Sequence, residues 1–142
     1  MKTMIFVGGL LIDGGSILLK DESGSQKWSR PPGKYLEGDE TLEMAVSKGF
    51  KDETGWMCAV RDLCYVIESF RGEGERELGV YFLVGVPSPR ARGDMLPGLR
   101  FVSMQEMVTM DVRPAVLAGK VFADEKRGAR GSATYLVNQW NG

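Results

Sequence analysis

The fold of this chain is decided by residues 33–56, which read GKYLEGDETLEMAVSKGFKDETGW. Asp39 or Thr41 can cap the N-terminus of a helix here, because short polar side chains accept hydrogen bonds from the free backbone N–H groups of a first turn. Gly55 can end that helix in a left-handed backbone conformation. Apolar residues recur at every fourth position between these ends, namely Leu42, Val46 and Phe50. The stretch therefore predicts a loop, a helix that packs by one side, and a second loop.

The acidic residues of this helix are candidate metal ligands. At about 100° of rotation per residue, Lys48 and Asp52 lie one turn apart, and so do Gly49 and Glu53. A carboxylate beside an apolar face is costly to desolvate unless a cation or a hydrogen-bond donor compensates it. A divalent cation with oxygen ligands, shared with substrate phosphates, would do so. The alternative is an ordinary solvated helix face, and the Gly-Asp-Glu entry and Glu-Thr-Gly exit favour the site over it.

Taken together, Gly33 to Trp56 resembles the Nudix box. That motif runs Gly, five residues, Glu, seven residues, Arg-Glu, an apolar residue, any residue, Glu-Glu, any residue, Gly and an apolar residue. The match places Glu40 at the first Glu, and Asp52 and Glu53 at the acidic pair. The resemblance implies an α+β fold, a Nudix-type α/β/α sandwich with a mixed β-sheet, the box helix and a C-terminal helix. It also implies that the helix acids hold Mg²⁺ or Mn²⁺ against a diphosphate.

Four positions depart from the motif. Lys48 stands where the motif has Arg, and it lacks the planar fork that binds a carboxylate through two parallel bonds. Gly49 stands where the motif has Glu. Asp52 is one methylene shorter than the usual Glu. Gly33 lies one residue too far upstream, so either the preceding loop carries an extra residue or Lys34 replaces the motif glycine.

Gly49 allows three interpretations, because a glycine inside a helix costs about 0.5–1 kcal/mol relative to alanine and is not there to build the helix. The site has lost hydrolysis and kept ligand binding, or another acid supplies the missing ligand, or Gly49 makes room for close packing and catalysis is weak. For the second interpretation we expect Glu75, with Glu73 and Glu77 as substitutes, to lie near the box helix.

The resemblance implies a hydrolase acting on a nucleoside diphosphate linked to another moiety, such as a nucleoside triphosphate or a sugar nucleotide. A divalent ion would neutralise the diphosphate and activate water. The metal-side acids would be Glu40, Asp52 and Glu53. The catalytic set would be Asp52, Glu53, Lys48 and Glu75, with the base drawn from Asp52 or the Glu75 loop and Lys48 orienting the acids or touching phosphate. The alternative is a catalytically inactive nucleotide-binding or protein-interaction module. Trp28 is a candidate to stack on a base, although core packing is the commoner role of such an aromatic residue.

Composition narrows the remaining options. The chain has 142 residues and is most simply one domain, residues 1–125, with residues 126–142 as its C-terminal extension. A formal net charge of −1 gives no reason to expect a nucleic-acid polymer or a membrane as partner, and a homodimer stays open. The absence of histidine excludes His-dependent catalysis and His-ligated metals. Cys58 and Cys64 lie six residues apart, which predicts one shared strand face in a reducing cytoplasm.

The rest of the chain mixes strands and helices. The pattern predicts strands over residues 4–12, 16–20, 56–68, 78–86 and 99–102, a helical turn over 105–110, a helix over 113–123, and loops over 21–26, 71–77 and 87–98. Pro31 and Pro32 predict a turn directly before the box helix. The tail either frays or adds a strand around residues 135–137.

Overall fold

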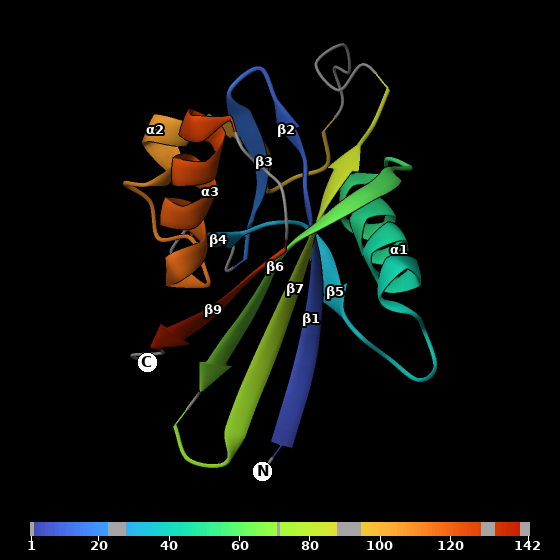
Figure 1. The fold of residues 1–142 in the computed structure, drawn as a ribbon. Helices are drawn as coiled ribbons and strands as arrows, with labels where there is room; N and C mark the ends of the chain where they lie inside the picture. Colours follow the sequence, from blue (N-terminus) through green and yellow to red (C-terminus); the bar gives the residue numbers. More distant parts are fainter. Residues whose placement is uncertain (1, 23–27, 71, 88–94, 129–132, 140–142) are drawn as a thin grey trace.

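The computed structural model describes residues 2–22, 28–70, 72–87, 95–128 and 133–139 (Figure 1). Its strands are β1 (Lys2–Leu10), β2 (Ile12–Asp13), β3 (Ser16–Asp21), β4 (Ser29–Arg30), β5 (Gly33–Tyr35), β6 (Ala59–Phe70), β7 (Glu75–Gly85), β8 (Leu99–Ser103) and β9 (Thr134–Gln139). Its helices are α1 (Leu42–Thr54), α2 (Met104–Met107) and α3 (Ala115–Arg127). The predicted loops at 21–26 and 87–98 fall partly outside the described residues.

The main sheet has five strands in the order β5-β1-β7-β6-β9. It is mixed. The pairs β1–β7 and β6–β9 are parallel, and the pairs β1–β5 and β6–β7 are antiparallel. In a second sheet, β3 lies next to β2, β4 and β8. The tail therefore adds a strand, β9, to the edge of the main sheet.

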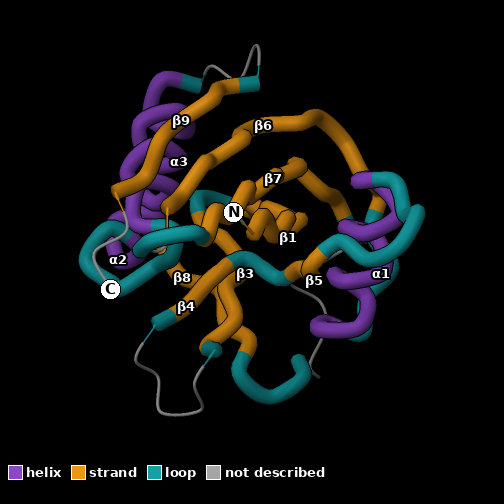
Figure 2. The backbone as a smooth tube through the Cα atoms, turned by 90° about the horizontal axis from the view of Figure 1, so that it is seen from below, coloured by secondary structure: helices purple, strands orange, loops and turns teal. Residues whose placement is uncertain are grey.

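The helices form the outer layers, with α1 on one side of the main sheet and α2 and α3 on the other (Figures 1 and 2). Each side has its own hydrophobic cluster. Phe50 and Val46 of α1 pack on one face with Val7 and Val80, and Leu117 belongs to the cluster on the opposite face. This arrangement confirms the α+β sandwich with a mixed sheet, a box helix and a C-terminal helix.

The box helix begins and ends where its capping residues predict. The side chain of Thr41 accepts a hydrogen bond from the backbone N–H of Met44, and Gly55 takes a left-handed conformation with φ of 79°. Of the two candidate caps, Thr41 is the one used. The C-terminal helix runs to Arg127, four residues beyond its predicted end, and Gly128 closes it in the same left-handed way. Among the described residues, no helix is long and apolar enough to cross a membrane.

Two local predictions are wrong. The chain does bend at Pro32, after β4, but this bend does not lead directly into the box helix, because the strand β5 follows it, with Gly33 paired to Gly8 of β1. Cys58 and Cys64 do not share a strand face, because Cys58 precedes β6 and packs on the α1 side while Cys64 lies in the opposite cluster. The pairing of β6 with β7 shifts register twice between Val60 and Tyr65, and each shift breaks the simple alternation of faces.

Candidate functional site

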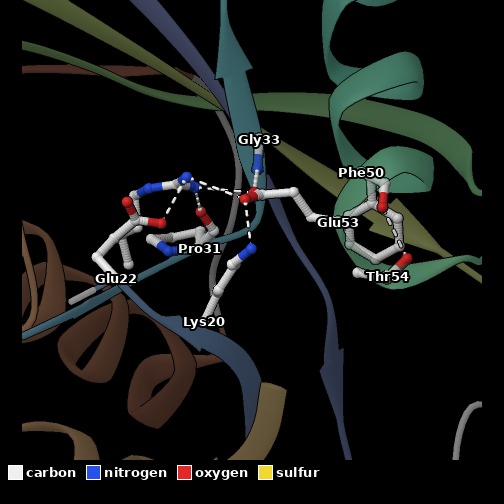
Figure 3. Close-up of polar contacts among 8 residues, drawn as sticks. Lys20, Glu22, Pro31, Gly33, Phe50, Glu53 and Thr54 are labelled. Carbon is white, nitrogen blue, oxygen red and sulfur yellow. Dashed lines mark hydrogen bonds and ion pairs between the residues drawn. The ribbon is translucent and has the colours of Figure 1, made fainter. Parts of the chain in front are cut away.

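The site centres on Glu53, in the last turn of α1 (Figure 3). One carboxylate oxygen, Oε1, accepts a hydrogen bond from the backbone N–H of Gly33 at 2.8 Å and from Nη1 of Arg30 at 3.0 Å. The other oxygen, Oε2, accepts from Nη2 of Arg30 at 3.1 Å and lies 3.0 Å from Nζ of Lys20. Both oxygens of Glu53 are thus held by groups of the chain itself.

This environment keeps Glu53 ionised. Burial of the side chain would raise the pKa of Glu53, but the hydrogen bonds and charge of Arg30, with the Gly33 N–H and Lys20, outweigh burial and lower that pKa below its usual value. Since Lys20 belongs to β3, Arg30 to β4 and Gly33 to β5, this one carboxylate ties α1 to three strands.

Arg30 is the second centre of this network. Besides Glu53, its guanidinium donates to the backbone carbonyl of Pro31 at 2.9 Å and lies 2.7 Å from a carboxylate oxygen of Glu22. It also lies over the ring of Phe6, 4.6 Å from the ring centroid. A planar fork with five donors suits this position, because it serves two carboxylates and a carbonyl together.

A second ion pair forms at the entry to α1. Nζ of Lys34 lies 2.9 Å from both carboxylate oxygens of Glu40, and Oε1 of Glu40 also accepts the backbone N–H of Glu37 at 3.0 Å. The hydrogen bond with Glu40 is the main reason that the pKa of Lys34 is raised, and the same bond lowers the pKa of Glu40. The charge of Asp52 also raises the pKa of Lys34, so two acids of the predicted metal set act on this ammonium.

Gly49 lies in a tight contact between α1 and β5. A Cβ atom at this position would stand 2.7 Å from the carbonyl carbon of Gly33 and 2.8 Å from both the backbone N and Cγ of Lys34. Such distances are shorter than real Cβ contacts, and two of the three atoms belong to the backbone. Of the three interpretations of Gly49, the geometry therefore supports close packing.

Of the other predicted catalytic residues, Lys48 and Asp52 act on the Lys34–Glu40 pair through their charges, whereas Glu75 lies apart. Lys48 and Asp52 are exposed on α1. Glu75 is exposed at the start of β7. Tyr81, six residues further along β7, pairs with the same residue of β1, Gly8, that pairs with Gly33 of β5 on its other side. Six strand residues span about 20 Å, so the structure does not bring Glu75 to Glu53. Glu73, in the same loop, is exposed as well.

Glu77 is the one acid of that loop region that lies near the site. It is 9% exposed, and one of its oxygens accepts the hydroxyl hydrogen of Tyr35 at 2.8 Å. A small cavity of about 70 Å³ lies between this pair and Arg30. Its lining combines aromatic and charged side chains: Phe6, Glu22, Trp28, Arg30, Tyr35, Glu77, Tyr81, Arg113 and Pro114.

The motif indicates Glu40 and Glu53, but it indicates neither their cationic partners nor Glu22. Lys20, Arg30 and Tyr35 lie outside the conserved positions of the motif, or at variable positions within it, and nothing in their spacing relates them to Glu53 or Glu77. The usable signal is Lys34, which stands at the position of the motif glycine when Glu40 is the first Glu of the motif. A lysine at a glycine position next to an acidic helix indicates an ion pair.

The predicted metal ligands do not fit a divalent cation in this arrangement. Mg²⁺ and Mn²⁺ need several free oxygen ligands around one point. Both oxygens of Glu53 and both oxygens of Glu40 bind cationic side chains or backbone N–H groups, and Gly49 contributes no carboxylate. Over the described part of the chain, no three acidic or cysteine side chains are grouped so that they could hold a metal ion.

Comparison with solved structures places this fold. A Nudix hydrolase from Nitrosomonas europaea matches with a TM-score of 0.73 and 22% identity, over 92% of this chain and 93% of that one. A UDP-X diphosphatase matches with a TM-score of 0.73 and 16% identity, over 96% of this chain and 68% of that one. The Ap4A hydrolase of C. elegans matches with a TM-score of 0.68 and 12% identity, over 89% of this chain and 98% of that one. The sequence matches no family model and no curated protein. The chain has the fold of the Nudix hydrolases.

Proposed function

We propose that this chain binds a small-molecule nucleotide and does not hydrolyse it through a bound metal ion. The observation that carries the proposal is that Glu53, the central acid of the box, has both oxygens bound by Arg30, Lys20 and the Gly33 N–H. A metal ligand must present a free lone pair to the ion, and here four donors already occupy the carboxylate.

The fold supports a nucleotide as the ligand. The solved structures that resemble this chain include proteins described as a UDP-X diphosphatase and an Ap4A hydrolase, whose names give nucleoside phosphates as their substrates. The shared architecture is compatible with the same class of ligand.

The cavity beside Arg30 has a volume of about 70 Å³, which is too small to enclose a nucleoside, so a nucleotide would lie across its mouth with only part of a base inside. Tyr35 offers a ring surface on which a base could stack, and so does the face of Trp28 that the Arg113 guanidinium does not cover. Glu22 and Glu77 offer acceptors for the amino or imino hydrogens of a base edge. The terminal N–H groups of Arg30 already bind Glu53, Glu22 and the Pro31 carbonyl, so a phosphate attached to the nucleoside would meet the guanidinium of Arg113, which also lines the cavity.

Hydrolysis would require the site to rearrange. For Mg²⁺ or Mn²⁺ to bind Glu40, Asp52 and Glu53, the ion pairs with Lys34, Arg30 and Lys20 would have to open. Breaking an ion pair that is largely shielded from water leaves an uncompensated charge, which typically costs a few kcal/mol. The metal-dependent hydrolase is therefore the second reading, and turnover is the result that would favour it.

One experiment separates the two readings. The protein is incubated with nucleoside triphosphates, ADP-ribose and sugar nucleotides, with Mg²⁺, with Mn²⁺ and with EDTA, and phosphate or pyrophosphate release is measured beside the midpoint of thermal unfolding, Tm. We expect one ligand class to raise Tm equally in metal and in EDTA, without turnover. Metal-dependent turnover would contradict the proposal, and so would a panel in which no nucleotide changes Tm.

A matched pair of variants locates the binding. Trp28→Ala removes an aromatic ring from the cavity and should abolish most of the ligand-induced rise in Tm. Phe70→Ala removes an exposed ring at the far end of β6 and should leave that rise unchanged. An equal loss in both variants would show that the ligand does not bind at the cavity.

A further inference from the structure

The two most unusual departures from the box face each other in space. With Glu40 as the first Glu of the motif, the motif glycine falls at position 34 and the motif Glu at position 49. The chain has Lys34 and Gly49 at these positions, and a Cβ at position 49 would stand 2.8 Å from Lys34 Cγ. The small and the large residue have thus changed places across the contact between β5 and α1.

This exchange also reverses the charge. A carboxylate on the helix is absent, and an ammonium from the strand is present. The Lys34 side chain lies against the glycine, and its Nζ bonds both oxygens of Glu40 at 2.9 Å. The side chains of Lys34 and Glu40 are only 15% and 17% exposed, so the pair is largely shielded from solvent. Further negative charge from Glu37 and Asp52 reaches the same ammonium.

We infer that the Lys34 ammonium is a tethered cation that takes the place of a divalent ion among the acids at the start of the box, and that it excludes such an ion. A covalently attached cation needs no free metal and is present at a fixed position whenever the chain is folded. Two observations carry the inference: the bidentate contact with Glu40 and the packing of the lysine stem over Gly49. It does not depend on nucleotide binding, so it and the proposed function can fail separately.

The test is a titration with Mn²⁺ alone, without any nucleotide. Binding is followed by calorimetry and by the paramagnetic resonance signal of free Mn²⁺, for the parent chain, Lys34→Met and Lys34→Arg. Methionine keeps an unbranched stem of similar length over Gly49 and removes the charge, whereas arginine keeps the charge.

We expect the parent and Lys34→Arg to show no saturable binding below millimolar Mn²⁺, and Lys34→Met to bind at least about tenfold more tightly than either. Adding Glu40→Gln to Lys34→Met should remove the gain, because Glu40 would be a ligand of the ion. Parent binding as tight as that of Lys34→Met would overturn the inference, as would the absence of any gain in Lys34→Met.

A second measurement covers the case in which Lys34→Met does not fold. The Tm of the parent chain is compared in EDTA, Mg²⁺ and Mn²⁺ at constant ionic strength. A folded protein that already carries its cation should show the same Tm in all three. A rise in Tm with either ion that Glu40→Gln abolishes would overturn the inference by itself, since it would place a metal ion at the position assigned to Lys34.

Discussion

Lys34 and Gly49 face each other across the contact between β5 and α1, and neither can be changed without consequences for the other. A Cβ at position 49 would lie 2.8 Å from the Lys34 backbone N and 2.8 Å from its Cγ. The two departures from the Nudix box at these positions are therefore one coupled change in volume and charge. Read separately, Gly49 looks like a deleted ligand. Read together with Lys34, Gly49 is the residue whose missing side chain leaves room for the side chain of Lys34.

The first prediction concerns Gly49→Ala. Alanine favours a helix over glycine by about 0.5–1 kcal/mol, but overpacking a tight contact costs about 1–3 kcal/mol, so the variant should lose stability. Gly119→Ala is the matched control, because Gly119 lies inside α3 with nothing within 4 Å of a Cβ. That variant should gain about 0.5–1 kcal/mol. Urea unfolding of both variants checks the pair, and a more stable Gly49→Ala would refute the close-packing interpretation.

The second prediction concerns Glu53→Gln. The amide keeps the shape of the side chain but loses the charge that pairs with Arg30 and Lys20, so the free energy of unfolding should fall by about 1–3 kcal/mol. The control is Asp52→Asn, because Asp52 directly precedes Glu53 and is exposed. This variant should change the free energy of unfolding by less than about 0.5 kcal/mol. If the two variants lose equal stability, Glu53 is not the centre of the network that ties α1 to the strands.

The third prediction concerns pH. The pKa of Glu53 is lowered in the folded chain, so this carboxylate stabilises the fold above its unfolded pKa, and the contribution is lost as pH falls through the folded value. The stability difference between the parent and Glu53→Gln should be largest near neutral pH and should shrink below about pH 4. Urea unfolding at a series of pH values measures it. A difference that stays constant from neutral pH to acid would contradict the lowered pKa.

The helix, its cap and its layer could be predicted from sequence because they depend on local patterns. An apolar row at every fourth position, a threonine before it and a glycine after it specify α1 within a short window. The face assignment of Cys64 relative to Cys58 could not be predicted, because it depends on two register shifts in the pairing of β6 with β7. A bulge is a property of two strands together and leaves little trace in either one.

The site divides in the same way. Glu40 and Glu53 follow the spacing of the motif, whereas Glu22 was not expected and the cations of the network, Lys20, Arg30 and Lys34, come from three separate strands. Arg30 reaches Glu53 across 23 residues, and Tyr35 reaches Glu77 across 42. The pairing of β5 with β1, and of β1 with β7, brings Tyr35 to Glu77, whereas Arg30 reaches Glu53 from β4, which pairs with β3. The ion pairs determine whether a carboxylate is free to bind a metal, so the sequence motif alone could not settle the chemistry of the site.

The fourth prediction concerns Arg30→Lys. Lysine keeps the positive charge but cannot donate to both oxygens of Glu53 in parallel while also serving Glu22 and the Pro31 carbonyl. The variant should therefore lose about 1–3 kcal/mol of stability, and any ligand held at the neighbouring cavity should bind more weakly, because the guanidinium also lines that cavity.

Arg100→Lys is the control for that substitution, since Arg100 is 45% exposed and its ion pairs with Asp21 and Glu106 are both 3.8 Å long. Exposed pairs of this kind contribute about 0–1 kcal/mol, so Arg100→Lys should unfold close to the parent. Unfolding and ligand-induced Tm shifts of both variants are measured side by side. If Arg30→Lys retains full stability, charge alone satisfies Glu53, the fork geometry is not needed, and the carboxylate is freer to accept a metal ion than its four contacts indicate.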